Sequence, residues 1–227
     1  MDYKIDPDLI KKYLEGIDLK KSAKDIPPFS TSPTFERDNS QNLASRVRMK
    51  SSFDGLNVLT ASRARDIEQI IALLIMRGSI NPDNLSGEVV DFGMGTGSGA
   101  YVLNEYGGRV TGVDTSESGV KTAIQEGILP PERALVKDGF QYLAQLKPGS
   151  IDFIAAFMMH SGFPHQRLYA ESQRVLKTGG QLLVTGGFVE LKDELQRTIG
   201  RYGKVEDVIT VHKDATLGNC AFTYTKR

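Results

Sequence analysis

Apolar and polar residues alternate regularly from about residue 87 to the end of the chain. Short apolar runs there take turns with stretches of helical periodicity, a pattern typical of a parallel sheet whose strands are joined by crossover helices. The pattern predicts seven strands, at about 87–92, 109–114, 133–137, 151–157, 181–187, 204–212 and 218–226. It also predicts helices between the first six of these strands, at about 98–106, 116–126, 139–146, 164–176 and 190–202.

The last two predicted strands have no helix between them, so they should pair as an antiparallel hairpin. The predicted fold class is therefore α/β: a seven-stranded, mostly parallel sheet with an antiparallel last strand and helices on both faces. Residues 87–227 would form this domain.

Residues 1–86 lack this alternation and are predicted to form a helical and loop extension that acts as a substrate lid or cap. One helix is expected at about 6–17 and a stronger one from about Ser62 to Arg77. The apolar face of the second helix should pack into the core; it consists of Ile67, Ile70, Ile71, Leu74 and Ile75. The loop between the two helices contains three aromatic residues, which could either close over a site as a lid or hold the loop against the domain; they are Phe29, Phe35 and Phe53.

Composition narrows the classes of protein that need to be considered. Hydrophobic residues make up 40% of the chain, which is enough for a packed core. Lys and Arg number 28, as do Asp and Glu, and this balance weighs against duplex nucleic acid as the main partner while leaving a local basic patch open. The single cysteine, Cys220, excludes a disulfide within the chain and a cysteine-rich zinc site, and no metal is expected.

The same composition gives an expectation for localisation. The charged N-terminus lacks the apolar core of a secretion signal, and no apolar run is long enough to cross a membrane. A cytoplasmic protein without a membrane partner is expected, whereas the oligomeric state cannot be predicted from these features.

The sharpest motif is a glycine-rich turn after the first predicted strand. The strand ends with Asp91 and is followed by alternate glycines, which are Gly93, Gly95, Gly97 and Gly99. Glycine lets the backbone turn sharply with positive φ and approach a ligand without a Cβ atom in the way.

Two ligand classes fit this turn. Residues 95–100 read as G-x-G-x-x-A, a dinucleotide fingerprint, whereas residues 91–97 read as D-x-G-x-G-x-G. The position of Asp91 favours the second class, because a carboxylate at the strand tip would repel a pyrophosphate and would suit a cationic group.

Two further acids follow the next two strands. Asp114 lies 23 residues after Asp91, a spacing at which an acid accepts hydrogen bonds from ribose hydroxyls. Asp114 could also cap the helix that starts near Thr115, and the two roles can coexist. Asp138 follows the third strand.

These motifs together resemble the class I (Rossmann-like) methyltransferases that depend on S-adenosylmethionine, in particular the small-molecule type. The segment 91–97 resembles their motif I, and 150–154 (SIDFI) resembles their fourth strand, S-[FY]-D-x-[VI]. Residues 171–180 are similar to their E-x-x-R-V-L-K-P-G-G turn, with Thr178 in place of proline. The closing hairpin matches their reversed seventh strand.

The resemblance implies S-adenosyl-L-methionine as cofactor and S-adenosyl-L-homocysteine as product, bound over the carboxyl ends of the strands at the switch point between Asp91 and Asp152. Asp91 would face the methionine amine, Asp114 the ribose and Asp138 the adenine amine. The residues expected to hold the cofactor are Asp91, Gly93, Met94, Gly95, Gly97, Asp114, Thr115, Asp138, Gly139, Phe140 and Phe157. Phe140 fits a place near the adenine and a place in the core equally well.

The segment after the fourth strand is where the family's catalytic groups often lie. His160 is the first candidate for a general base and His165 the second, because a neutral imidazole accepts protons near pH 7. His160 could instead cap a helix or be a polar loop residue, since not every methyltransferase uses a base.

The same segment disfavours two nucleic-acid classes. Residues 155–158 (AAFM) lack the [DNS]-P-P-[YFW] motif of enzymes that methylate exocyclic amines of bases. The cytosine-C5 class needs a Pro-Cys nucleophile, whereas Cys220 lies in the last predicted strand.

The prediction is an enzyme that transfers a methyl group to an oxygen or nitrogen of a small molecule, which could be anionic. An RNA methyltransferase is the first alternative, because the segment 46–65 carries Arg46, Arg48, Lys50, Arg63 and Arg65 against Asp54. Those charges fit a solvated surface as well. A non-catalytic cofactor-binding module with the same fold and a nicotinamide oxidoreductase would also fit the glycine-rich turn.

Overall fold

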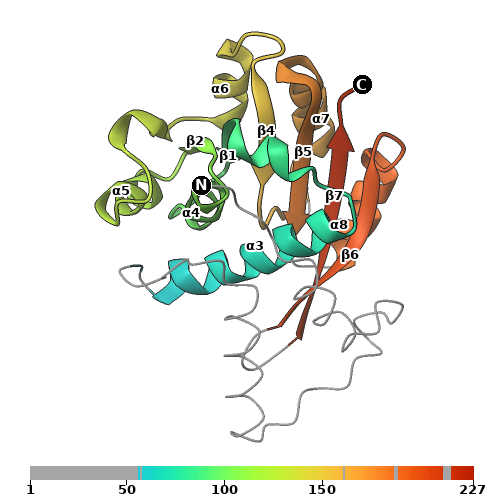
Figure 1. Ribbon diagram of the computed structural model, residues 1–227, viewed down its shortest axis with the longest axis horizontal. Coiled ribbons are helices and arrows are strands. Elements are labelled where there is room, and N and C mark those ends of the chain that lie inside the picture. Colours follow the sequence, from blue (N-terminus) through green and yellow to red (C-terminus); the bar gives the residue numbers. More distant parts are fainter. Residues whose placement is uncertain (1–55, 57, 161, 187–188, 212–215) are drawn as a thin grey trace, which may run out of the picture.

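The computed structural model describes residues 56, 58–160, 162–186, 189–211 and 216–227, and Figure 1 shows their arrangement. The helix expected at about 6–17 and the aromatic residues Phe29, Phe35 and Phe53 lie outside the described residues. The described strands are β1 (Glu88–Phe92), β2 (Arg109–Asp114), β3 (Ala134–Val136), β4 (Ile151–Ala156), β5 (Leu176–Gly186), β6 (Lys204–Val211) and β7 (Thr216–Thr225).

These strands form one seven-stranded sheet in the order β3-β2-β1-β4-β5-β7-β6. The pairs β1–β2, β2–β3, β1–β4 and β4–β5 are parallel, and β7 runs antiparallel to both of its neighbours, β5 and β6. The expected class I fold with a reversed last strand is confirmed. Strand order reverses direction between β1 and β4, which makes their carboxyl ends the switch point where α/β folds bind ligands.

Helices cover both faces of the sheet, as expected. One face carries α3 (Val58–Met76), α4 (Ser98–Glu105) and α5 (Glu117–Gln125), and the other carries α6 (Gly139–Gln145), α7 (His165–Val175) and α8 (Val189–Thr198). Successive side chains of β1 point to opposite faces of the sheet. Val89 packs with the first group of helices, whereas Val90 and Phe92 pack with the second.

Helix α3 shares the core of the sheet domain. Its expected apolar face is confirmed, because Ile67, Ile70, Ile71 and Leu74 are buried and Ile75 packs against them at half burial. The helix contacts α4 and β6. The division of the chain into an extension up to residue 86 and a domain from residue 87 stays a prediction.

Strand β5 begins five residues earlier than the sequence pattern suggested. Leu176 pairs with Ile151 of β4, and the backbones of Gly179 and Gly180 exchange hydrogen bonds of 2.8 and 2.9 Å with Lys226 after β7. Residues 176–180 therefore pair with β4 on one side and with the end of the chain after β7 on the other, although two successive glycines are typical of a turn.

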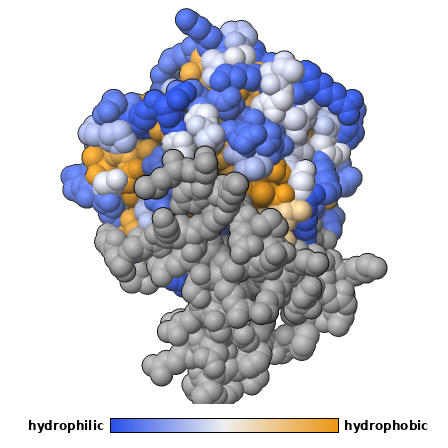
Figure 2. Space-filling model, viewed as in Figure 1, coloured by the Kyte–Doolittle hydropathy of each residue, from blue (hydrophilic) through white to orange (hydrophobic). Residues whose placement is uncertain are grey.

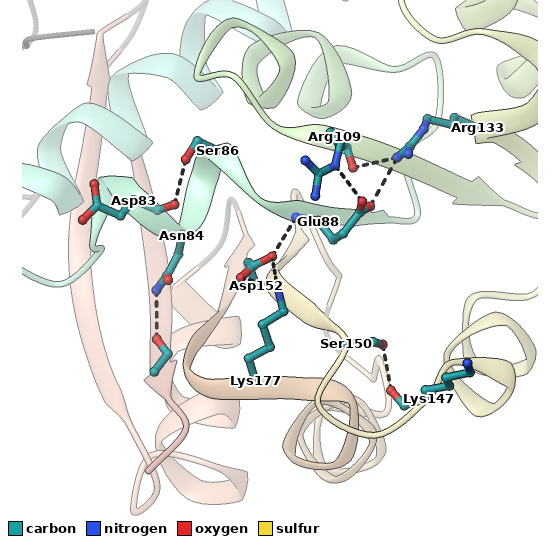
Figure 3. A network of polar contacts seen from close by, with 11 residues as sticks. Asp83, Asn84, Ser86, Glu88, Arg109, Arg133, Lys147, Ser150, Asp152 and Lys177 are labelled. Carbon is teal, nitrogen blue, oxygen red and sulfur yellow. Dashed lines mark hydrogen bonds and ion pairs between the residues drawn. The ribbon is translucent and has the colours of Figure 1, made fainter. Parts of the chain in front are cut away.

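Charged side chains are paired along the amino edge of the sheet (Figure 3). One oxygen of Asp152 accepts a hydrogen bond from the amide of Glu88 at 2.8 Å and pairs with the ammonium of Lys177 at 2.8 Å. Glu88 pairs with Arg109 at 2.7 Å and Arg133 at 3.5 Å. Asp152 thus joins β1, β4 and β5 where these strands meet.

This position corrects one expectation. Asp152 is the second residue of β4, whereas Asp91 pairs with Ala155, near the other end of that strand. The two acids therefore lie at opposite edges of the sheet, and Asp152 does not belong to the switch point.

Few large apolar side chains are exposed among the residues that the structure describes. Figure 2 shows one face on which hydrophilic residues surround smaller apolar patches. Among the described residues, the large hydrophobic side chains classed as exposed are those of Val136, Met158 and Tyr202. No described helix combines the length and the apolar content needed to cross a membrane.

We expect Asp152→Ala to lower the free energy of unfolding by about 1–3 kcal/mol, because the amide of Glu88 and the ammonium of Lys177 lose their shared acceptor. Urea denaturation measures this loss. Calorimetry should find the affinity for S-adenosylhomocysteine unchanged, and a variant that keeps its stability but loses that affinity would show that Asp152 acts in the binding site.

Candidate active site

The glycine-rich turn joins β1 to α4 at the carboxyl edge of the sheet. Gly93, Gly95 and Gly97 have φ values of 72°, 54° and 90°, a backbone conformation that residues with a Cβ atom rarely adopt. The amides of Gly93 and Met94 donate to the carbonyl oxygen of Val113, at 2.8 and 3.1 Å. The turn is therefore fastened to the end of β2.

Asp91 lies beneath the start of α4 and is almost completely buried, at 1% exposure. Within the described part of the chain, neither of its carboxylate oxygens accepts a hydrogen bond of ordinary geometry, although the amide of Ala100 lies close enough to favour the ionised form. A Cβ atom added to Gly99 would lie 2.7 Å from Asp91 Oδ2 and 2.5 Å from the ring of Phe157, so the glycine makes room for both side chains.

The burial of Asp91 changes its chemistry. Desolvation raises its pKa to about 7, partly offset by the nearby amide of Ala100 and reinforced by the negative charge of Asp114. A buried carboxyl group without a partner is costly, and a cation brought next to it would both satisfy its oxygens and favour its ionised form.

Asp114 holds the glycine-rich turn from the neighbouring strand. Its Oδ2 accepts a hydrogen bond from the amide of Gly95 at 2.8 Å, and its Oδ1 accepts one from the amide of Ser116 at 2.7 Å. The helix cap of α5 is Ser116, whose hydroxyl accepts from the amide of Gly119. A carboxylate offers about four acceptor positions, so Asp114 retains capacity for ribose hydroxyls.

Asp138 is the N-cap of α6. Its Oδ1 accepts a hydrogen bond from the amide of Gln141 at 2.9 Å. The ring of Phe92 lies against the backbone of Gly139, where an added Cβ atom would collide with it. A contact of Asp138 and Gly139 with adenine stays a prediction, and the capping bond shows what positions this acid.

Phe140 has a clear place in the core. Its ring is 7% exposed and packs edge-on against Phe92, with 5.0 Å between ring centroids. The guanidinium of Arg167 lies 4.2 Å from the centroid of the same ring. The packing role considered for Phe140 is therefore present, and an additional contact with adenine stays a prediction.

Three other expected cofactor residues are placed as follows. The side chain of Met94 is 5% exposed and lies against the backbone of Gly112, so any cofactor contact of Met94 would involve its backbone. Gly97 allows close packing of α4 on α5, because an added Cβ atom would lie 3.0 Å from that of Ala123. Thr115 is exposed beside Asp114.

The two candidate bases have different environments. His160 is exposed in the segment after β4, with its ring edge-on to Phe163 at 6.4 Å between centroids. His165 is the first residue of α7 and only 2% exposed. Desolvation lowers the pKa of His165, while Glu194 raises it and His160 lowers it further. Of the two rings, that of His160 is accessible from solution and that of His165 is not.

Two residues near the turn were missed by the sequence reasoning. The hydroxyl of Thr60 on α3 lies 3.0 Å from the hydroxyl of Thr96 in the glycine-rich turn, and Thr60 is fully buried. Ser98, the first residue of α4, is 5% exposed, and its hydroxyl has no hydrogen-bond partner in the described structure. Neither position has a sequence signal, since both depend on tertiary contacts or burial.

The described residues contain no group of three His, Cys, Asp or Glu side chains that could hold a metal ion. Cys220 is buried in β7, as an inert packing residue would be. Of the basic segment, Arg46, Arg48, Lys50 and Asp54 lie outside the described residues, while Arg63 is exposed and Arg65 half-buried on α3.

Comparisons with known proteins agree with this geometry. Residues 90–184 match a family model described as a methyltransferase domain. A search of curated proteins found no relative of the chain.

Solved structures share the fold at low sequence identity. The PH0226 protein of Pyrococcus horikoshii OT3 is 19% identical, with a TM-score of 0.50, over 77% of this chain and 94% of that one. Protein 1320 of Thermoplasma acidophilum is 15% identical, with a TM-score of 0.51, over 74% and 96% of the two chains. A SAM-dependent methyltransferase of Agrobacterium tumefaciens is 11% identical, with a TM-score of 0.51, over 70% and 63%.

The fold and the switch-point turn define a class I, Rossmann-like α/β domain. The matched segment, residues 90–184, contains that turn together with β2, β3 and β4, so this part of the chain is similar to a methyltransferase domain.

The raised pKa of Asp91 gives a prediction for stability without ligand. Between about pH 4 and about pH 7 the native carboxyl group keeps a proton that the unfolded chain has released, so the free energy of unfolding should fall as pH rises. Asp91→Asn should lack this contribution, because its amide does not titrate. Urea denaturation of both proteins across this range measures the difference, and parallel curves would contradict the prediction.

Proposed function

We propose that this chain transfers the methyl group of S-adenosylmethionine to an oxygen or nitrogen atom of a small-molecule acceptor. The observation that carries the cofactor assignment is the carboxylate of Asp91, buried at the switch point without a hydrogen-bond partner among the described residues. A cationic ligand group satisfies such a carboxylate, and an α-amino group has the required charge and donors.

Other residues at the same edge fit the rest of the cofactor. Asp114 is fixed by two backbone amides and keeps acceptor positions for a ribose. Asp138 and Gly139 lie at the start of α6, after β3, where they would contact the edge of the adenine. The positive φ values of Gly93 and Gly95 let the backbone turn sharply beside the ligand.

The bound cofactor supplies a methyl carbon already activated by a positively charged sulfur. The residues of the chain therefore need to position the acceptor and keep water away, which accounts for much of the rate of such displacements. His160 can accept the proton of an acceptor hydroxyl or amine, since it is exposed just beyond the carboxyl end of β4.

The acceptor is proposed to be a small molecule on three grounds. Residues 155–158 lack the proline-rich motif of base-modifying enzymes, Cys220 is buried in β7, and the formal net charge of the chain is zero. An RNA acceptor remains the alternative because of the basic segment 46–65. A gel shift of RNA that weakens with salt would favour that alternative.

We expect His160→Gln to lower kcat about 10²- to 10⁴-fold with an acceptor that must lose a proton. The measurement is transfer of labelled methyl from S-adenosylmethionine to a panel of small alcohols, carboxylates and amines. The affinity for S-adenosylhomocysteine, measured by calorimetry, should stay unchanged, and added imidazole should restore part of the rate of a His160→Gly variant.

Full activity of His160→Gln on such an acceptor would show that no base acts at this position. Cofactor binding by the wild-type protein without transfer to any small molecule or RNA would favour the non-catalytic binding module instead. Preferential binding of NAD over S-adenosylhomocysteine would favour a nicotinamide oxidoreductase.

A further inference from the structure

The segment that follows β4 and carries His160, of which the structure describes residues 157–160 and 162–163, is attached to the fold at both ends. At its start, the amides of Met158 and Met159 donate to the hydroxyl and the carbonyl oxygen of Thr185 on β5, at 3.1 and 2.8 Å. Met158 has φ of 57°, the only positive value of a non-glycine residue in the described chain. Such a conformation costs energy and persists where surrounding contacts enforce it.

The other end of the segment is held by one carboxylate of α8. Glu194 Oε2 accepts a hydrogen bond from the amide of Gly162 at 3.0 Å, and Glu194 Oε1 lies 3.5 Å from Nε2 of His165. A single side chain thus contacts both the end of the segment and the first residue of α7.

The contact between Glu194 and His165 is largely shielded from water. The side chains of His165 and Glu194 are 1% and 17% exposed, so water competes little for either group. Neither ring nitrogen of His165 makes a hydrogen bond within the described residues. The carboxylate of Glu194, at 3.5 Å, is a charged group of α8 in contact with this buried ring.

Aromatic packing connects the same contact to the candidate base and to the adenine side of the site. The ring of Phe163 lies 5.1 Å from that of His165 and 6.4 Å from that of His160. It also lies 5.9 Å from Phe140 and 5.8 Å from Phe92, the residue before Gly93. A shift of Phe163 would therefore disturb His160 and the neighbourhood of the glycine-rich turn together, because close-packed rings cannot move independently.

We propose that Glu194 is a positioning residue for methyl transfer: by holding Gly162 and His165 it fixes the segment 157–163 and sets the place of His160 relative to the bound cofactor. This inference rests on the proposed function. Glu194 does not act on the acceptor itself, since both of its oxygens are directed to the chain.

The test follows His160 directly by nuclear magnetic resonance. The chain has three histidines, so the ring signals can be assigned with single substitutions. S-adenosylhomocysteine should shift the His160 ring signal in the wild-type protein, and this shift should disappear in Glu194→Ala while the calorimetric affinity changes by no more than about twofold.

Two variants separate positioning from a general effect on stability. Glu194→Gln keeps an oxygen that can accept from Gly162, so it should preserve the His160 shift. Glu171→Ala removes a carboxylate that pairs with Arg174 three residues along α7, at 3.0 Å, and should leave the His160 shift unchanged. If Glu194→Ala does not fold, Glu194→Asp replaces it, because its shorter carboxylate keeps the charge but does not span both partners.

Hydrogen exchange of the ligand-free protein gives an independent readout. Glu194→Ala should accelerate exchange of the amides of residues 158–160, 162, 163 and 165, and Glu171→Ala should not. With any acceptor found for the wild-type enzyme, Glu194→Ala should lower kcat about 10- to 100-fold with little change in the KM for S-adenosylmethionine.

An unchanged His160 shift in Glu194→Ala, or one lost equally in Glu171→Ala, would overturn the positioning role while leaving the proposed function intact. A wild-type protein that binds S-adenosylhomocysteine without any response of His160 would overturn it as well. Failure of the wild-type protein to bind S-adenosylhomocysteine would instead overturn the proposed function on which this inference rests.

Discussion

The site is organised around the burial of one carboxyl group, that of Asp91. Removing a carboxylate from water costs several kcal/mol unless a partner compensates, and the described residues supply no hydrogen bond to either oxygen. The alternation of β1 leaves little choice of position, because Asp91 shares its face with Val89 and must lie under α4. Gly99 makes this arrangement possible, since a side chain there would collide with both Asp91 and Phe157.

Asp152, another acid of the same sheet, differs from Asp91 because its carboxylate has partners within the chain. At the opposite edge, the carboxylate of Asp152 accepts a hydrogen bond from the amide of Glu88 and pairs with the ammonium of Lys177, and so it joins three strands. The charged side chains at the amino edge of the sheet are thus paired with one another, whereas at the carboxyl edge neither oxygen of Asp91 has a hydrogen-bond partner among the described residues. That contrast, together with the order reversal between β1 and β4, supports the proposed binding site at the switch point.

The sequence predicted the architecture because periodicity and strand-tip motifs are local signals. Alternating apolar runs defined every described strand, and the glycine spacing located the turn. The start of β5 was misplaced, since Gly179 and Gly180 look like a turn until their pairing with Lys226 is known. The spacing of acids likewise could not show that Asp138 caps α6.

Long-range contacts could not be predicted in this way. Thr60 meets Thr96 across 36 positions, and Glu194 reaches Gly162 across 32, with no motif at either site. The burial of His165 was equally invisible, because a histidine at a helix start has the same sequence context whether it faces solvent or the core. The residues proposed to hold a cofactor were therefore accessible from sequence, and the contacts proposed to position the acceptor side were not.

The most direct test compares two ligands on two proteins: S-adenosylhomocysteine and its analogue without the α-amino group, bound to the wild-type chain and to Asp91→Asn. If Asp91 receives the amine, loss of the amino group should weaken binding to the wild-type protein about 10- to 100-fold and binding to Asp91→Asn much less, as measured by calorimetry above pH 7. An equal loss of affinity in both proteins would contradict the account.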